Sequence, residues 1–282
     1  MNTHVVVAGV GMIPFAKPGQ NAPYPRMAAD ATRAALADAG IAYEQVQQAY
    51  AGYVYGDSTA GQRALYEVGM TGIPIVNVNN NCSTGSTALY LGAQSIRGGL
   101  ADCVLALGFE KMQPGSLGGG ASDRESPLGN HIKALMKLDE LAFPVAPWMF
   151  GAAGREYMRT YGATAEHFAK IGYKNHKHSV NNPYAQFQEE YSLDDILGAK
   201  MISDPLTKLQ CSPTSDGSAA VVLASEAFVD SHGLAGQAVE IVGQAMTTDF
   251  ASTFDGSAKN IIGYDMNVQA ARKVYDQRDR KS

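Results

Sequence analysis

Cysteine is scarce in this chain, with three residues among 282. Cys82, Cys103 and Cys211 show neither the spacing of a disulfide framework nor a CxxC pair. This scarcity argues against a disulfide scaffold and against a structural zinc site, so we expect no bound metal. It also favours a reducing compartment.

Long apolar runs are lacking as well, since no stretch reaches the roughly 20 residues that a membrane-spanning helix needs. Met1 leads directly into strand-like residues, so we expect no signal peptide. The formal net charge of −5 makes a nucleic-acid surface unexpected, while a local basic patch for a phosphorylated small molecule is still compatible with it. We expect a cytoplasmic protein, or a peroxisomal or mitochondrial one in a eukaryote, although the final RKS is not a peroxisomal SKL ending.

The composition is that of a folded protein, with 45% hydrophobic and 17% charged residues. Expected strands alternate with expected helices, which predicts an α/β fold with a mostly parallel sheet covered by helices on both faces. The expected strands are His4–Val10, Ala49–Tyr55, Ile73–Val78, Asp102–Gly108, Ser218–Ala224 and Ala238–Ala245. The expected helices are Tyr24–Ala39, Gly61–Gly69, the segment after Cys82, Gly151–Tyr161, Thr164–His178, Ser225–His232 and Asn267–Asp276.

The central feature is the stretch Ile73–Ile96, where an apolar run ends in three asparagines and Cys82 before a helix of small residues begins. Cys82 is therefore expected at a strand-to-helix corner. Backbone N–H groups and the positive end of the helix dipole converge at such a corner and favour a thiolate. A plain buried cysteine beside a tight turn is the alternative to a nucleophile.

Between the strands lies a long excursion that contains Gly118–Gly120, several prolines and two or three helical pieces. We expect a lid or loop domain that carries binding contacts. His176 and His178 lie there among lysines; a basic, partly buried surface is the simplest interpretation, with a phosphate contact or catalysis as alternatives. Asp216 and the glycine after it are expected to be turn residues that position the returning strand, while Cys103 and Cys211 are expected to be structural.

The chain divides accordingly into three parts. Residues 1–110 and 211–235 form a core, residues 111–210 form the inserted loop domain, and residues 236–282 begin a second copy of the core. The last assignment depends on AVEIVGQA and NVQAARKVYD, which resemble the opening strand and helix of the chain. This second copy is incomplete in the sequence.

Several motifs resemble those of the thiolase family, and within it the sterol-carrier branch. They are NVNNNCSTGSTALY, VLALGFEKM, GYVYGDSTAGQRALYE, FAKIGYKNHKHSVNNPYAQFQ, SPTSDGSAA and DMNVQAARKVYD. The resemblance covers almost the whole chain. It implies a five-layered αβαβα body made of two similar halves, a loop domain that holds coenzyme A, and a dimer formed through the first sheet.

The resemblance also implies roles for individual residues. Cys82 matches the nucleophile, which attacks the 3-keto carbon of a 3-oxoacyl-CoA and carries the shortened acyl chain as a thioester to coenzyme A. The backbone N–H of Cys82 would contribute to an oxyanion hole. Met149 and Phe150 lie where family members contact pantetheine, His178 is a candidate for a phosphate of coenzyme A, and Gly243 stands where many thiolases have a serine. Coenzyme A is thus expected as a substrate, with no tightly bound cofactor.

Three family segments are absent from the sequence: HDCF or NEAF, the GHP histidine and the CxG cysteine. A half thiolase would also expose apolar faces, so association is expected. Three interpretations stay open. The chain is a truncated or spliced thiolase with impaired acyltransferase activity, a subunit completed by a thiolase-like or lipid-transfer partner, or a module that binds acyl-CoA or lipid without turnover.

Overall fold

The computed structural model describes residues 4–112, 116 and 125–279, so the Gly118–Gly120 run lies outside the described residues. The chain forms two compact units. The sheet unit comprises Met1–Pro114, Thr214–Met246 and Gln277–Ser282. The helical unit comprises Gly115–Pro213 and Thr247–Asp276.

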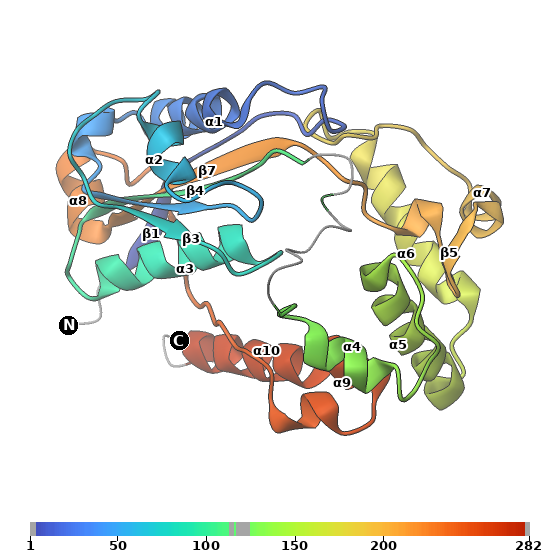
Figure 1. The fold of residues 1–282 in the computed structure, drawn as a ribbon. Helices are drawn as coiled ribbons and strands as arrows, with labels where there is room; N and C mark the ends of the chain where they lie inside the picture. Colours follow the sequence, from blue (N-terminus) through green and yellow to red (C-terminus); the bar gives the residue numbers. More distant parts are fainter. Residues whose placement is uncertain (1–3, 113–115, 117–124, 280–282) are drawn as a thin grey trace. The chain divides into compact units, whose positions relative to one another are not determined.

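The sheet unit contains a six-stranded sheet with helices on both faces (Figure 1). Its strands are β1 (Val5–Met12), β2 (Gln48–Gly52), β3 (Ile75–Val78), β4 (Cys103–Glu110), β7 (Gly217–Ser225) and β8 (Val239–Glu240). Its helices are α1 (Tyr24–Ala39), η1 (Tyr43–Gln45), α2 (Ala60–Leu65), α3 (Thr84–Arg97) and α8 (Glu226–His232). The layered α/β prediction is therefore confirmed.

The strand order is β3-β2-β4-β7-β1-β8. Only the β2–β3 and β2–β4 pairs are parallel, because β7 pairs antiparallel with both β4 and β1, and β8 pairs antiparallel with β1. The prediction of a mostly parallel sheet is wrong. The reason is the path of the excursion: β4 ends at Glu110, β7 begins at Gly217, and these two residues are partners across the ladder. Because β7 begins opposite the residue at which β4 ends, the two strands must run in opposite directions.

Both faces of the sheet are buried, which explains the continuous apolar character of its central strand. Leu105 and Leu107 of β4 pack in the cluster with α1, α2 and α8, whereas Val104 and Ala106 pack in the cluster with α3. This alternation follows from the two-residue period of a strand.

Local sequence signals set the ends of two helices. Gly40 ends α1 in the left-handed region at φ 70°, as a terminal glycine does. The Ser225 side chain accepts a hydrogen bond of 3.1 Å from the Phe228 N–H and so caps α8. These ends agree to within one residue with the predicted helices Tyr24–Ala39 and Ser225–His232.

The helical unit contains α4 (Gly129–Leu135), α5 (Val145–Tyr161), α6 (Ala165–Ser179), α7 (Leu193–Gly198), η2 (Lys208–Gln210), η3 (Ala251–Phe254), α9 (Ala258–Ile261), most of α10 (Tyr264–Asp279) and a two-stranded sheet of β5 (Met201–Ser203) and β6 (Leu206–Thr207). Its core surrounds Trp148, whose indole donates a 2.9 Å hydrogen bond to Asp139. Helix α5 begins at Val145, before the predicted Gly151, because Pro147 falls in the first turn, where a missing N–H costs nothing. None of the helices within residues 4–112 and 125–279 is both long and apolar enough to cross a membrane.

Residues 236–282 are shared between the units. The predicted strand Ala238–Ala245 is reduced to β8, which pairs with β1, and residues up to Met246 stay with the sheet unit. The predicted helix Asn267–Asp276 lies inside α10. That residues 236–282 begin a second thiolase half stays a prediction.

Candidate functional site

Cys82 lies between the end of β3 and the start of α3, at the strand-to-helix corner that the sequence predicts. Its side chain is exposed, and Sγ lies 3.8 Å from the Asn81 side-chain oxygen. Asn81 has a φ of 49°, a left-handed conformation that asparagine tolerates better than most residues. The alternative of a buried structural cysteine is therefore wrong for this position.

Asn80 fixes the turn that carries the thiol. Its N–H donates a 2.8 Å hydrogen bond to the Thr84 hydroxyl, and its side-chain amide donates a 2.9 Å bond to the Thr87 hydroxyl. Its carbonyl accepts bonds from both the N–H and the hydroxyl of Ser83. These bonds tie the residues before Cys82 to the first turn of α3, so the thiol is held at the amino end of a 14-residue helix.

Gly52 lets α3 approach the sheet closely. A Cβ on Gly52, at the end of β2, would lie 2.8 Å from Thr84 Cγ2 and 2.9 Å from the Thr84 carbonyl oxygen. A Cβ on Gly108, in β4, would lie 3.6 Å from the Gly85 Cα, which is an ordinary van der Waals contact, so that position does not require a glycine. The height of the nucleophile turn above the sheet therefore depends on Gly52.

Glu110 organises the end of β2 beside this turn. Its carboxylate accepts hydrogen bonds from the N–H groups of Val54, at 2.8 Å, and Tyr55, at 3.2 Å. Burial raises the pKa of the Glu110 carboxyl, although these hydrogen bonds lower it. Burial also raises the pKa of the Tyr55 phenol, with further contributions from the charges of Glu110 and Cys82. Tyr55 thus belongs to the electrostatic surroundings of the thiol.

A segment from Ile241 to Met246 runs along α3 in the opposite direction. The Ile241 carbonyl accepts from the Arg97 side chain at 3.3 Å, and the Gln244 side chain donates to the Tyr90 carbonyl at 3.2 Å. Met246 Sδ then lies 3.9 Å from the Asn80 side-chain nitrogen and 3.8 Å from the Thr87 hydroxyl. Gly243 lies within this segment and is half-buried. The segment therefore leads from the far end of α3 to the nucleophile turn.

The other predicted ligand contacts lie in the helical unit. Met149 is 9% exposed and packs in the cluster around Trp148, whereas the next residue, Phe150, is 54% exposed. His178 is exposed near the end of α6, while the His176 ring is bonded to the Leu209 carbonyl at 2.8 Å. These positions agree with the expected basic, partly buried surface, since His176 is half-buried and His178 is exposed. Contacts of Met149, Phe150 and His178 with coenzyme A stay predictions.

The other two cysteines differ from Cys82 in their surroundings. Cys103 is fully buried in β4, and burial raises the pKa of its thiol to about 12. Burial also raises the pKa of the partly buried Cys211. Both observations agree with structural roles, because neither thiol ionises readily.

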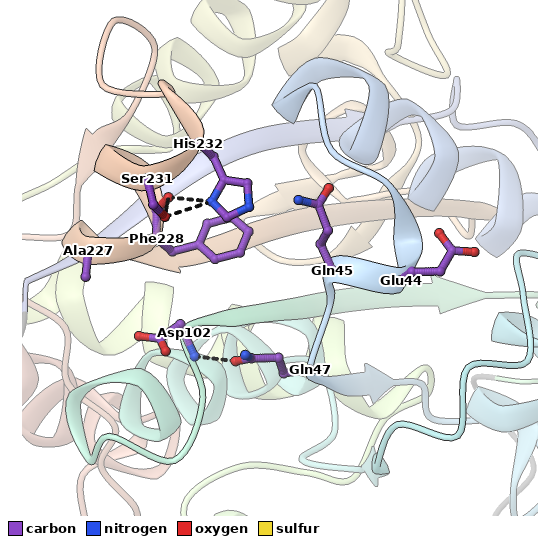
Figure 2. Close-up of a pocket in the computed structure, with 8 residues that line it drawn as sticks. All are labelled: Glu44, Gln45, Gln47, Asp102, Ala227, Phe228, Ser231 and His232. Atoms are coloured by element: carbon purple, nitrogen blue, oxygen red, sulfur yellow. Dashed lines mark hydrogen bonds between the residues drawn. The ribbon is translucent and has the colours of Figure 1, made fainter.

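A surface cavity of about 470 Å³ lies where the parallel strands β2 and β4 begin, at the end opposite to the Cys82 corner (Figure 2). Its lining includes Asp102 and Gln47, which directly precede β4 and β2, and the stacked rings of Phe228 and His232. Cys82 follows β3, which is parallel to β2, so the cavity and the thiol are at different ends of the strands. The cavity is not part of the candidate site.

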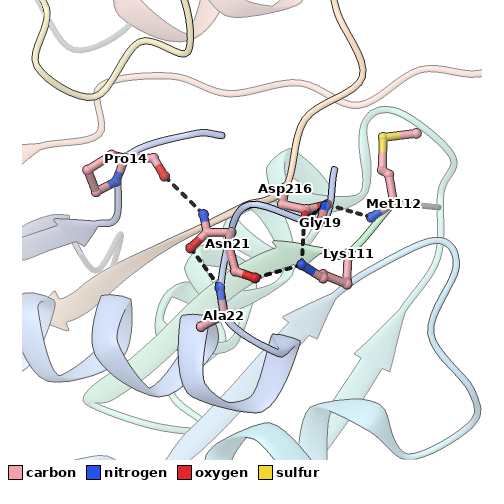
Figure 3. A network of polar contacts seen from close by, with 7 residues as sticks. All are labelled: Pro14, Gly19, Asn21, Ala22, Lys111, Met112 and Asp216. Carbon is pink, nitrogen blue, oxygen red and sulfur yellow. Dashed lines mark hydrogen bonds and ion pairs between the residues drawn. The ribbon is translucent and has the colours of Figure 1, made fainter. Parts of the chain in front are cut away.

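Asp216 is a buried anchor rather than a simple turn residue (Figure 3). Its carboxylate accepts from the Lys111 ammonium at 2.6 Å and from the N–H groups of Met112, at 2.8 Å, and Gly19, at 3.1 Å. The Lys111 ammonium also donates to the Asn21 carbonyl at 2.8 Å. The network joins the chain that leaves β4 to the chain that enters β7.

Sequence reasoning missed four residues that shape the site: Gly52, Tyr55, Glu110 and Met246. A glycine that ends a strand is a signal for close approach, and it was available for Gly52. Met246 is 166 residues from Asn80 in sequence, so no local pattern could link them. Among the described residues, no group of three or more His, Cys, Asp or Glu side chains is placed to hold a metal ion. The arrangement presents an exposed thiol at a helix amino end, which suits covalent acyl chemistry.

Comparisons with known proteins agree with this geometry. Residues 5–227 match the family described as thiolase, N-terminal domain. The chain is 59% identical over 277 residues to sterol carrier protein 2 of Rattus norvegicus, covering 96% of this chain and 51% of the relative. It is 47% identical over 279 residues to non-specific lipid-transfer protein-like 2 of Caenorhabditis elegans, covering 96% of this chain and 68% of the relative.

The solved structure of the Ltp2-ChsH2(DUF35) aldolase has the same fold, with a TM-score of 0.76 at 21% identity over 98% of this chain and 70% of that one. The chain spans about half the length of sterol carrier protein 2. The family match nevertheless includes β3, Cys82 and α3. The chain therefore belongs to the thiolase family.

Proposed function

We propose that this chain carries the nucleophile of a thiolase-type acyl-CoA acyltransferase that acts on 3-oxoacyl-CoA in fatty-acid or sterol side-chain metabolism. The observation that carries the proposal is the exposed Cys82 thiol at the amino end of α3, in a turn fixed by Asn80. The similarity to sterol carrier protein 2 and to a lipid-transfer protein-like relative supports the lipid substrate class.

In the proposed reaction, the Cys82 thiolate attacks the 3-keto carbon of the substrate. The bond between C2 and C3 breaks, its electron pair stays on C2, and a proton from an acid converts that carbon into the methyl group of acetyl-CoA. The shortened acyl chain is then a thioester on Cys82. The thiolate of free coenzyme A attacks this thioester, releases the acyl-CoA and restores Cys82.

The helical unit is proposed to hold coenzyme A. Phe150 is an exposed aromatic residue, next to the largely buried Met149, that would pack on the pantetheine arm, and His178 is exposed beside Lys174 and Lys177, where a phosphate would be attracted. Gly243 carries no hydroxyl, so no side-chain hydrogen bond to the ligand can form there. Coenzyme A is a substrate in this proposal.

The acid for C2 and the base for incoming coenzyme A are proposed to come from HDCF, GHP and CxG segments, which the printed sequence does not contain. A second chain carrying them would complete the site, and a homodimer through the first sheet is expected as well. We therefore expect an acyl adduct on Cys82 of these 282 residues but little complete turnover.

Intact-mass spectrometry after incubation with a 3-oxoacyl-CoA or an acyl-CoA tests the proposal. We expect a single adduct of the acyl mass that is absent from Cys82→Ser and retained in Cys211→Ser. Coexpression with a chain that carries the three segments should add steady-state thiolysis. Coenzyme A binding without an adduct, unchanged in Cys82→Ala, would show a binding module and contradict the proposal.

A further inference from the structure

Met246 places an apolar side chain beside the polar turn that carries the nucleophile. Its sulfur contacts Asn80 and Thr87, which are the two residues that the turn itself joins by a 2.9 Å hydrogen bond. Met246 is 42% exposed, so it is not fully covered by the turn, and it contacts Asn80, two residues before the exposed Cys82. A flexible, polarisable methionine adapts well to apolar ligands of varied shape.

The position of Met246 is fixed by the backbone before it. The Ile241 N–H donates to the Val5 carbonyl at 2.9 Å, which ties this segment to β1. The Gln277 side chain makes two bonds of 3.1 Å with Gln244, one to its N–H and one to its carbonyl. With the bonds of Ile241 to Arg97 and of Gln244 to Tyr90, the approach to Met246 is held at successive points along α3.

We propose that Met246 is a specificity-determining residue, which forms an apolar wall against the acyl group carried by Cys82. The identity of that group as an acyl chain depends on the proposed function, whereas the wall itself depends only on the contacts around Asn80. The turn from Asn79 to Ser83 offers amide and hydroxyl groups, which favour the polar thioester end of a substrate. Met246 supplies the apolar surface that the adjoining methylene groups need.

The wall can be tested on the thiol without any enzymatic turnover. Alkyl methanethiosulfonates with methyl, butyl and octyl groups transfer their thioalkyl group to a thiolate, forming a mixed disulfide and releasing methanesulfinate. Rate constants at Cys82 are measured by peptide mass spectrometry on the full chain, with Cys82→Ser as the blank. The informative quantity is the ratio of the octyl rate to the methyl rate.

If Met246 forms the wall, this ratio should change by about tenfold or more in Met246→Ala, since one apolar group in a pocket has effects of about 10–200-fold. Met246→Leu, which keeps the volume, should leave the ratio close to that of the wild type. Met201→Ala is the matched control, because Met201 is a methionine of similar exposure, at 50%, in the helical unit. Circular dichroism melting confirms that each variant is folded.

The two proposals fail in different ways. Three results would overturn the proposal that Met246 forms an apolar wall. They are an unchanged ratio in Met246→Ala, an equal change in Met201→Ala, and a Cys82 that reacts with none of the reagents. A changed ratio without any acyl adduct from acyl-CoA would uphold the wall and contradict the proposed acyl transfer.

Discussion

Gly52 and Thr84 meet where β2 ends and α3 begins, and a Cβ on residue 52 would lie 2.8 Å from the Thr84 methyl carbon. No side chain can occupy that space unless the helix moves, because the Thr84 carbonyl is equally close at 2.9 Å. The turn with Cys82 is tied to Thr84 through Asn80. Residue 52 therefore sets where the thiol stands.

Gly52→Ala should lower the free energy of unfolding by about 1–3 kcal/mol, because it forces an overpacked contact between the sheet and α3. It should also slow the alkylation of Cys82, since the turn must shift. Urea unfolding and timed alkylation with mass spectrometry measure the two effects. Gly85→Ala is the control: its Cβ would meet no atom within 4 Å, so its stability should be unchanged or slightly higher. Equal behaviour of the two variants would contradict this account.

Glu110→Gln should destabilise the sheet unit by about 1–3 kcal/mol, because the amide offers one oxygen where the carboxylate offers two. One of the N–H groups of Val54 and Tyr55 would then face an NH₂ donor. Glu44→Gln, at an exposed position, should stay within about 0.5 kcal/mol of the wild type in urea unfolding. A loss at Glu110 no larger than that at Glu44 would rule out the bidentate role.

Lys111 and Asp216 should show strong coupling in a double-mutant cycle. Asp216→Asn alone should lower the free energy of unfolding by about 3 kcal/mol, because the partly buried Lys111 ammonium loses its counter-ion. Lys111→Met should also lower it, because the buried carboxylate then lacks one donor. The double variant should lose less than the sum of the two. The exposed Lys170–Glu166 pair should give a smaller coupling under the same conditions. Additivity of the Lys111 and Asp216 changes would contradict the prediction.

Tyr43 should make the protein less stable at alkaline pH. Burial raises the pKa of its phenol from 10.0 to about 12, so from pH 10 upward the unfolded chain releases this proton while the folded chain keeps it. The contribution of the protonated Tyr43 phenol to the free energy of unfolding is complete below pH 10 and is lost as the pH rises towards 12. Tyr43→Phe should remove this part of the decline, and the Cys103 thiol, with a pKa raised to about 12, should account for another part. Urea unfolding between pH 8 and pH 11 tests this; a Tyr43→Phe curve parallel to that of the wild type would contradict it.

Local signals predicted much of the sheet unit. The Gly40 end of α1, the Ser225 cap of α8 and the corner at Cys82 each depend on residues a few positions apart, which a sequence displays directly. The direction of β7 was not predictable in this way. It depends on where the chain returns after the excursion, and the decisive pair, Glu110 and Gly217, is far apart in sequence.

The strand predicted over Ala238–Ala245 shows a second limit of local patterns. Its apolar alternation is real, but pairing with β1 stops at Glu240. Beyond it, the Ile241 N–H still donates to Val5 of β1, but the Ile241 carbonyl accepts from Arg97 of α3. Gln244 then bonds to Tyr90 of α3 through its side chain and to Gln277 of α10 through its backbone. Met246 reaches the nucleophile turn only because of that change of partner.

The pairing of Glu110 with Gly217 has a consequence for how such proteins diversify. Since the two ends of the insertion are already adjacent in the ladder, its length and internal architecture place no demand on strand registry. The segment between β4 and β7 can be exchanged for another, in evolution or by design, while β4 and β7 keep their pairing in the sheet. Chemistry and ligand choice can then change separately.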